Sequence, residues 1–289
     1  MHAITVATVN LQAGVGTERA HQMLSRAWRF VLPHPDTPVV LAQAAAALAA
    51  ADIVAVQEAD AGSLRVAGRD LLHELGRLGS WTYSAAMTTR RWGAWAAICI
   101  GVLSRWPIVH TEAHRLPGSR HGRGAIVAQI RTPIGEIAVI CTHWSLRERA
   151  RLVQAETTAA IARSLSAPVV LMGDLNCTPA GTAYRRLCEQ ANLHGLRAAP
   201  PTWPSWRPRR AIDHILCSPE LRCVEAHTLH TRFSDHLPLV ARLRRRPPTP
   251  SAHRQTQARH NAASEEAADA TPECARASEG ACASARPSA

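Results

Sequence analysis

Short apolar segments rich in Val, Ile and Leu recur along the first 245 residues, and segments with helical periodicity lie between them. Apolar runs of this length, bounded by polar residues, predict buried β-strands. We expect strands at 3–10, 52–57, 80–87, 96–104, 124–131, 136–142, 168–173, 211–217, 221–230 and 237–243. So many strands with few helices favour two packed β-sheets with helices outside them, an α+β fold.

Helices are expected at 39–51, at 65–78, at 146–165 and from 179 onward. Thr37 followed by Pro38 marks the start of the first helix. Ser145 and Glu148 have the spacing of a capping box at the start of the third. Thr178 is the expected N-cap of the fourth.

The composition changes after residue 245. Residues 246–289 are rich in Ala, Pro, Ser and charged side chains and show no apolar periodicity. A segment of this kind buries too little apolar surface to offset its conformational entropy. We therefore expect one catalytic domain at 1–245 and a disordered tail at 246–289.

The chain of 289 residues has a formal net charge of +11, and all of its cationic side chains other than His are Arg. The absence of Lys excludes a lysine Schiff base, a lysine nucleophile and a P-loop phosphate lysine. The excess of Arg has two interpretations, the base composition of a GC-rich genome or a basic surface that attracts anionic substrates.

The eight Cys residues show no C-x-x-C spacing, and several lie in strand-like runs, where a free thiol behaves as a small hydrophobe. The first strand begins near residue 3, which leaves no room for a signal peptide. The apolar run at 39–51 is too short to cross a bilayer. We expect a monomeric cytoplasmic protein without a transmembrane segment.

Polar residues that can bind a metal or a phosphate stand at the ends of six apolar runs. They are Asn10, Glu58, His143, Asp174 with Asn176, Asp213, and Asp235 with His236. A buried charge needs a partner, so a carboxylate next to such a run usually has a metal, a ligand or a hydrogen bond. The repeated pattern indicates a metal-dependent phosphoester hydrolase.

The order of these motifs resembles that of the endonuclease/exonuclease/phosphatase superfamily, whose fold is like that of pancreatic deoxyribonuclease. The matching motifs are Asn10, Gln57-Glu58, Ser104 to Ile108, Thr142-His143, Gly173 to Asn176, Ile212 to His214 and Ser234 to His236. The resemblance covers residues 3 to 243. It implies a four-layered α/β sandwich with two mixed sheets and a site at one end of both sheets.

Hydrolysis of an anionic phosphodiester needs positive charge on the nonbridging oxygens and an activated water. Glu58 is the best hard oxygen ligand for Mg²⁺ or Mn²⁺, the expected cofactor. The resemblance implies that Asn10 lies beside Glu58 as a metal or phosphate contact. It also implies that Asp235 reaches the metal side of the site.

The remaining motif residues are expected to act on the water and the phosphate. His236 is the expected general base, polarised by Asp213. Asp174 would orient or deprotonate the attacking water, and whether it or His236 takes the proton stays open. Asn176 would donate to the phosphate, and His143 would donate to the phosphate or protect the leaving oxygen, stabilising charge as it develops.

Loops that interleave Arg and Trp are candidate substrate contacts. The clearest is the loop at 200–210, with Arg207, Arg209 and Arg210, which suits phosphate contact with stacking. The alternative is a solvated loop anchored by a buried Trp. Arg105 and Arg123 are open between phosphate contact and structural ion pairing.

The substrate class stays open at this level. An anionic phosphoester such as DNA or RNA is the leading substrate, and a lipid head group, an inositol phosphate or a small nucleotide is the alternative. A non-catalytic binding module is disfavoured because all the catalytic positions are present.

Two other motifs are rejected. A dinucleotide-binding fingerprint fails because Arg19 occupies its third glycine position. A zinc site fails because the spacing of Cys217, Cys223, His227 and His230 fits no standard zinc pattern.

Overall fold

The structure is a computed structural model that describes residues 2–17, 19–118, 122–231 and 233–247. Met1–Arg246 forms one compact unit. The tail for which the sequence predicts disorder lies, from residue 248 onward, outside the described residues. No helix in the described ranges is long and apolar enough to span a membrane.

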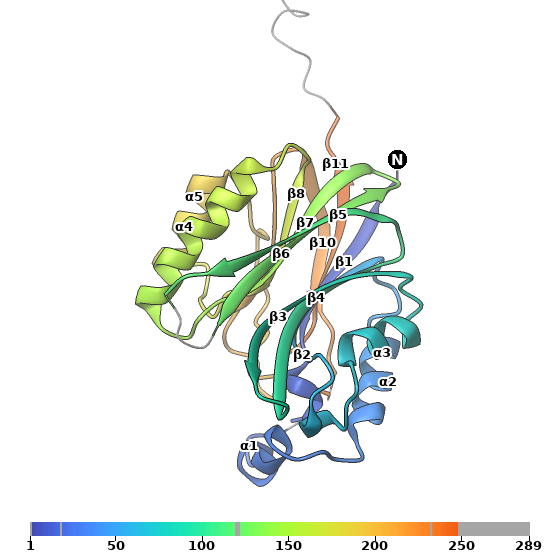
Figure 1. Cartoon of the computed structure of the whole chain (residues 1–289). Coiled ribbons are helices and arrows are strands. Elements are labelled where there is room, and N and C mark those ends of the chain that lie inside the picture. The colour runs from blue at the N-terminus through green and yellow to red at the C-terminus, as the bar shows by residue number, and fades with distance from the viewer. Residues whose placement is uncertain (1, 18, 119–121, 232, 248–289) are drawn as a thin grey trace, which may run out of the picture. The chain divides into compact units, whose positions relative to one another are not determined.

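The described residues form two mixed β-sheets, one of six strands and one of five (Figure 1). The first has the order β10-β11-β1-β2-β4-β3, with β1 at Ile4–Asn10, β2 at Ile53–Asp60, β3 at Tyr83–Trp92, β4 at Ala96–Ser104, β10 at Leu221–Thr228 and β11 at Leu239–Arg245. The second has the order β5-β6-β7-β8-β9, with β5 at Ile108–Leu116, β6 at Arg123–Thr132, β7 at Gly135–His143, β8 at Val169–Asp174 and β9 at Asp213–Cys217. Parallel pairing occurs between β1 and β2 and between β7 and β8.

Helices cover the outer face of each sheet. Their bounds are α1 Gln22–Ser25, α2 Thr37–Ala47, α3 Leu71–Leu78, α4 Glu148–Ser164 and α5 Thr182–Ala191, with short 3₁₀ turns η1 Gln12–Gly14, η2 Ala27–Phe30 and η3 Leu64–Val66. The pair α2 and α3 packs on the first sheet, and α4 and α5 pack on the second (Figure 1). The four-layered α/β sandwich is therefore confirmed.

The alternation of side chains along the central strands explains the layers. On β7, Ile137, Val139 and Cys141 lie in the core between the sheets, whereas Ala138 and Ile140 pack in the core beneath α4 and α5. Successive side chains of a strand point to opposite faces, so a strand that is apolar at every position is buried on both sides. Full burial of each large side chain stabilises the fold by about 1.5–3 kcal/mol.

Two strands differ from the sequence prediction. Strand β5 was not predicted, because IVHTEAHRL is mostly exposed and lies at the edge of its sheet, where no apolar alternation is needed. Strand β3 continues to Trp92, beyond the predicted end at residue 87, so Arg90, Arg91 and Trp92 lie on a strand.

The helix starts also differ. The predicted capping box does not form, because Arg147 is the N-cap of α4 and makes no side-chain cap, while Ser145 Oγ accepts from the Arg147 N–H at 3.2 Å. Helix α5 begins at Thr182 with Gly181 as its N-cap, later than predicted from Thr178. The segment predicted as one helix at 65–78 is η3 followed by α3, which is capped by Asp70.

Candidate active site

Strand pairing brings three of the predicted residues side by side on the second sheet. His143 at the end of β7 pairs in register with Asp174 at the end of β8, and Asp174 pairs in register with Asp213 at the start of β9. The first sheet supplies Asn10, at the end of β1, and His236, which lies three residues before the start of β11. Strand β11 begins at Leu239, and the pairing of Leu239 with Thr8 brings this segment to the same end of the sheet as Asn10. The site therefore forms at one end of both sheets.

Glu58 reaches the site from a β-bulge and not from the end of a strand. Strand β2 continues to Asp60, and its pairing with β4 shifts register between Val56 and Ala59. Glu58 adopts a left-handed backbone conformation with φ 51°. A bulge re-aims one side chain out of the regular alternation. As a result the Glu58 side chain stays 32% exposed and faces the site although its strand is buried.

The predicted residues surround a single cavity with a volume of about 250 Å³. Its lining consists of Asn10, Glu58, Arg123, His143, Leu146, Asp174, Asn176, Trp203, Arg210, Ile212, Asp235 and His236. Every predicted catalytic or metal residue except Asp213 is in this lining. Asp213 lies behind His236, with 1% of its side chain exposed.

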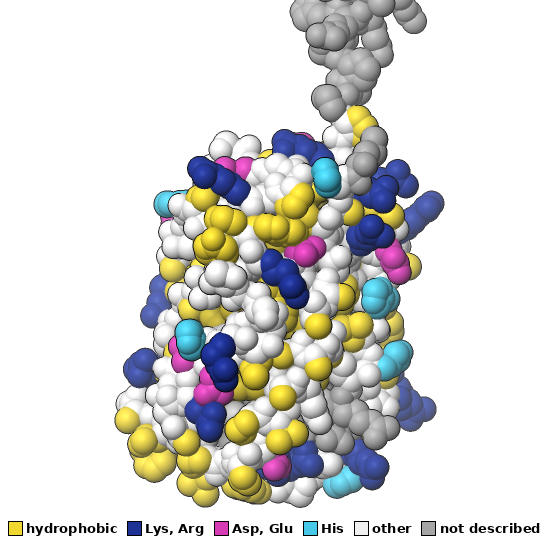
Figure 2. Space-filling model, turned by 90° about the vertical axis from the view of Figure 1, so that its right-hand side faces the viewer, with side chains coloured by type: hydrophobic (Ala, Val, Ile, Leu, Met, Phe, Trp, Pro, Cys, Tyr) yellow, Lys and Arg dark blue, Asp and Glu magenta, His cyan; other side chains and the backbone are white. Residues whose placement is uncertain are grey.

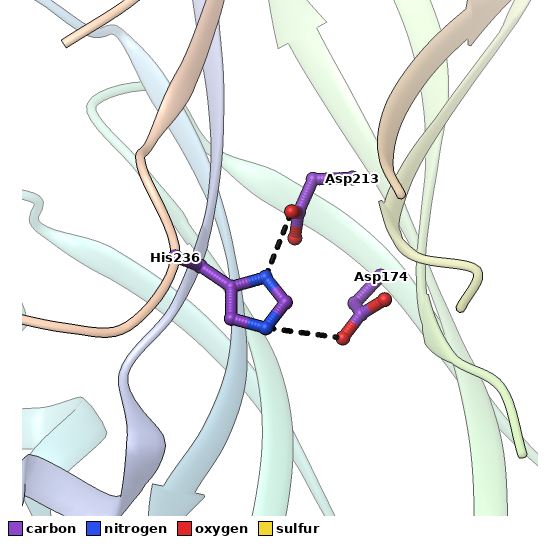
Figure 3. Close-up of side chains that lie close together, drawn as sticks. All are labelled: Asp174, Asp213 and His236. Atoms are coloured by element: carbon purple, nitrogen blue, oxygen red, sulfur yellow. Dashed lines mark hydrogen bonds and ion pairs between the residues drawn. The ribbon is translucent and has the colours of Figure 1, made fainter. Parts of the chain in front are cut away.

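His236 and Asp213 form a buried hydrogen-bonded pair (Figure 3). His236 Nδ1 lies 2.8 Å from Asp213 Oδ2, and His236 Nε2 lies 3.9 Å from Asp174 Oδ2. Burial lowers the pKa of His236, but the charge and hydrogen bond of Asp213 and the charge of Asp174 outweigh it and raise that pKa to about 10. Asp213 thus fixes the ring orientation and stabilises the imidazolium.

Asp174 stands at the centre of the site. Its Oδ2 accepts from Asn10 Nδ2 at 3.3 Å and lies 3.5 Å from His143 Nε2, while its Oδ1 accepts from the Asn176 N–H at 2.9 Å. Burial, followed by the charge of Asp213, raises the pKa of Asp174 to about 7. The Asn176 side chain donates to the Trp144 carbonyl at 3.0 Å, which leaves its second amide hydrogen for another acceptor.

Arg123, which the sequence left open between phosphate contact and ion pairing, lines the cavity and is hydrogen-bonded to His143. Its Nη1 lies 2.7 Å from His143 Nδ1. Because a guanidinium only donates, Nδ1 must accept, and the His143 proton is on Nε2, which faces the carboxylates of Asp174 and Glu58. Burial and the charges of Arg123 and His236 hold the pKa of His143 well below its usual value. His143 is therefore a neutral donor.

The donor set suits a divalent cation. Ligand atoms of Asp174, Asp213 and His236 lie within 4.8 Å of one another, so the site can hold a metal ion. Asp213 Oδ1 is buried and has no hydrogen-bond partner in the described part of the chain. Burial and then the charge of Asp235 raise the pKa of Glu58. Facing carboxylates of this kind are stabilised by a cation between them.

The predicted Arg contacts separate into two groups. Arg210 lines the cavity, with its guanidinium carbon 5.7 Å from the centre of the Trp203 ring. Arg207 and Arg209 are exposed and do not line it. Arg105 is structural, because it donates to the carbonyls of Ala51 and Ala49 at 3.2 and 2.7 Å.

Together, the fold and the site define a metal-dependent phosphoesterase. Residues 7–236 match the sequence model of the Endonuclease/Exonuclease/phosphatase family, and the chain belongs to this family.

Solved structures share the fold. An endonuclease/exonuclease/phosphatase from Beutenbergia cavernae is 22% identical with a TM-score of 0.67, over 85% of this chain and 72% of that one. The human Nocturnin catalytic domain with bound sulfate is 20% identical with a TM-score of 0.61, over 84% and 95%. A mannosyl-6-phosphatase from Bacteroides thetaiotaomicron is 18% identical with a TM-score of 0.56, over 83% and 99%. At these identities the likeness shows the fold alone.

Proposed function

We propose that this protein is a divalent-metal phosphodiesterase that hydrolyses the phosphodiester bonds of nucleotides. The main support is that three side-chain nitrogens lie around Asp174 Oδ2. His236 Nε2 is at 3.9 Å, His143 Nε2 at 3.5 Å and Asn10 Nδ2 at 3.3 Å. In this arrangement the carboxylate can accept a hydrogen bond from the attacking water, and the surrounding donors can bind the anionic phosphate.

Asp174, Asp213 and His236 are close enough to hold an ion, but in this proposal they act on the water and the phosphate. The cation, Mg²⁺ or Mn²⁺, would instead be held by Glu58, Asn10 and Asp235. These residues offer the carboxylate and amide oxygens that such ions prefer, and His236 Nδ1 is already bonded to Asp213. When bound, the ion supplies positive charge to a phosphate oxygen.

Asp174 is the proton acceptor in this proposal. A pKa of about 7 suits a general base that works near neutral pH. His236, with a pKa of about 10, would remain an imidazolium and neutralise charge on the phosphate. Asp174 Oδ2 and His236 Nε2 are close enough for one water oxygen to contact both at hydrogen-bond distance.

Three donors would hold the phosphate oxygens. His143 offers its Nε2–H, Asn176 offers its free amide hydrogen, and Arg210 offers its guanidinium at the wall of the cavity. The imidazole of His143 is neutral, so it can donate without adding a charge that would compete with the cation for the carboxylates. Donors placed in advance where charge develops stabilise the transition state.

The distribution of positive charge bears on the length of the substrate. Arg123 and Arg210 line the active-site cavity, whereas Arg207 and Arg209 of the loop that carries Arg210 do not. On the one face drawn in Figure 2, Arg side chains are likewise scattered among apolar and uncharged ones. A nuclease that follows a long polyanion releases counterions at each neutralised phosphate, so its binding weakens steeply with salt. We propose a short nucleotide substrate, whose binding weakens much less.

The test is turnover of bis(p-nitrophenyl) phosphate, p-nitrophenyl phosphate, an oligonucleotide and a dinucleotide, each with Mg²⁺ or Mn²⁺ and with EDTA. We expect metal-dependent cleavage of the diesters and a shallow salt dependence. Cleavage of the monoester alone would show a phosphatase, and a steep salt slope would show a polyanion substrate. No metal-dependent turnover of any of these would reject the proposal.

Variants assign the roles. Glu58→Gln, Asp174→Asn and His236→Ala should each lower turnover by about a thousandfold or more, as expected for groups that act in the transition state. Glu112→Gln, at an exposed position on β5, is the matched control and should retain activity. Near-normal turnover in any two of the three would reject the assignment.

The loop arginines form an internal comparison. Arg210→Ala should raise KM because Arg210 lines the cavity, whereas Arg207→Ala and Arg209→Ala should change KM little. Equal effects of all three substitutions would show that the whole loop contacts the substrate.

A further inference from the structure

A second cavity, with a volume of about 360 Å³, adjoins the active site. The two cavities share Glu58 and Arg123 in their walls. This volume falls in the range of small-ligand pockets. One substrate molecule can therefore place its reacting phosphate beside Glu58 and another group in the second cavity.

Arg65 forms part of this wall although it is only 4% exposed. Its Nε donates to Asp60 Oδ2 at 2.6 Å, and Ser63 donates to the same carboxylate from its backbone N–H and its Oγ, both at 2.8 Å. Arg65 Nη2 is buried and has no hydrogen-bond partner among the residues described. An unmet buried donor is costly, and an anionic acceptor would recover that free energy.

Arg90 faces the same cavity from β3, and its guanidinium carbon lies 3.4 Å from the centre of the Trp92 ring. Stacking of this kind orients the guanidinium plane. Arg90 makes no ion pair with an acidic side chain in the described ranges. Its charge is therefore available to a ligand.

The wall of the second cavity carries more positive than negative charge. Arg65, Arg90 and Arg123 line it together with one acidic residue, Glu58. The pKa of Arg90 is lowered, first by burial and then by the charges of Arg123 and Arg65, which means that these guanidiniums repel one another. An anion between them would relieve this repulsion.

Apolar side chains complete the cavity. Phe30, Val31, Trp92 and Ile98 lie in its wall, and Trp92 is 55% exposed. A flat ring packs well on such a surface, because aromatic side chains stack on bases of any sequence. The combination of three cations with apolar walls fits a phosphorylated nucleoside better than a bare anion.

We propose that this second cavity binds a further phosphate group of the nucleotide substrate, contacted by Arg65 and Arg90, and that it selects substrates that carry two phosphates. This proposal rests on the proposed function. It adds a specificity subsite to the hydrolytic centre.

The kinetic test compares a dinucleoside phosphodiester with and without a terminal phosphate. In the wild type the terminal phosphate should lower KM by about tenfold or more, as expected for charge-assisted hydrogen bonds. In Arg90→Gln the terminal phosphate should lower KM much less than it does in the wild type. Arg91→Gln is the matched control, because Arg91 is the next residue of the same strand, is exposed and does not line the cavity.

A binding experiment separates the subsite from catalysis. Calorimetric titration of the metal-free protein with a nucleoside bisphosphate and a nucleoside monophosphate should show tighter binding of the bisphosphate, by about tenfold. Arg90→Gln should lose this preference and Arg91→Gln should keep it. A sugar bisphosphate and a sugar monophosphate in the same assay distinguish a nucleotide ligand from a sugar phosphate.

The outcomes are distinct. Diester turnover without any preference for the second phosphate, or equal effects of Arg90→Gln and Arg91→Gln, would overturn the subsite and leave the proposed function intact. Bisphosphate preference without diester turnover would overturn the proposed function and support the subsite. An unchanged Tm in both variants establishes that folding is not the cause.

Discussion

Arg123 and His143 are joined by a hydrogen bond from Nη1 to Nδ1 of 2.7 Å, at the site end of the paired strands β6 and β7. The bond determines which nitrogen of His143 carries the proton. It also places a guanidinium at the wall shared by the two cavities.

Arg123→Gln should lower turnover by about tenfold to a hundredfold, because His143 loses the partner that fixes its tautomer. The pKa of His143 should rise in the variant, since the charge of Arg123 contributes to holding it low. NMR titration of the imidazole measures that shift. Arg131→Gln, at an exposed position of the same strand, is the control. An unchanged His143 titration would contradict this account.

Asp213→Asn should lower turnover by about a hundredfold to ten-thousandfold while leaving the fold intact, because the ring of His236 loses its orienting carboxylate. The pKa of His236 should fall, since the charge and hydrogen bond of Asp213 are the main factors that raise it. Comparison of the pH–rate profile with the His236 NMR titration checks both effects. Normal turnover with a shifted His236 pKa would show that the pair is structural only.

Metal binding should be visible in thermal stability. Mg²⁺ or Mn²⁺ should raise the Tm of the wild type, because a ligand that binds only the folded state stabilises it by about 2.7 kcal/mol at a hundred times its Kd. Glu58→Gln should abolish this increase. It should also raise the Tm of the metal-free protein, since it removes a carboxylate whose pKa is raised first by burial and then by the charge of Asp235. A full metal response in Glu58→Gln would place the ion elsewhere.

The stability of the metal-free protein should depend on pH through Asp174. Its pKa is raised from 3.8 to about 7 on folding, so the folded state binds the proton more tightly than the unfolded state does. The Tm of the wild type should therefore fall, relative to that of Asp174→Asn, as the pH rises from about 4 to about 7, and the difference should level off above that range. Parallel Tm curves for the two proteins would contradict the raised pKa.

Deletion of residues 247–289 should leave both Tm and turnover nearly unchanged. The prediction comes from the composition of this segment, which has no apolar periodicity with which to join a core. Thermal melting and diester turnover of the truncated chain measure both quantities. A large loss of either would show that the segment docks on the catalytic unit.

The sequence by itself determined the class of fold and most of the site. The central runs of β7 (137–141) and β8 (169–172) are apolar at every position, which is typical of a strand buried on both faces, so their places could be predicted. His143 and Asp174 stand at the ends of these two strands, and their motif order carried the resemblance to the family. Strand β5 could not be predicted in this way, because the pattern of an exposed edge strand contains no apolar alternation.

Only the tertiary structure decided how the chemical groups meet. Glu58 reaches the site through a bulge, and a bulge depends on the pairing of β2 with β4 rather than on local sequence. Arg123 and Arg210 line the active-site cavity, whereas Arg207 and Arg209 do not. Nothing in the local sequence of these four arginines distinguishes the two pairs. Likewise the cavity around Arg65 and Arg90 joins residues from β3 and from the segment after β2. Hydrogen bonds and close ion pairs form only between groups a few ångströms apart. For residues far apart along the chain, sheet register and packing decide which groups come that close, and local sequence patterns do not encode either.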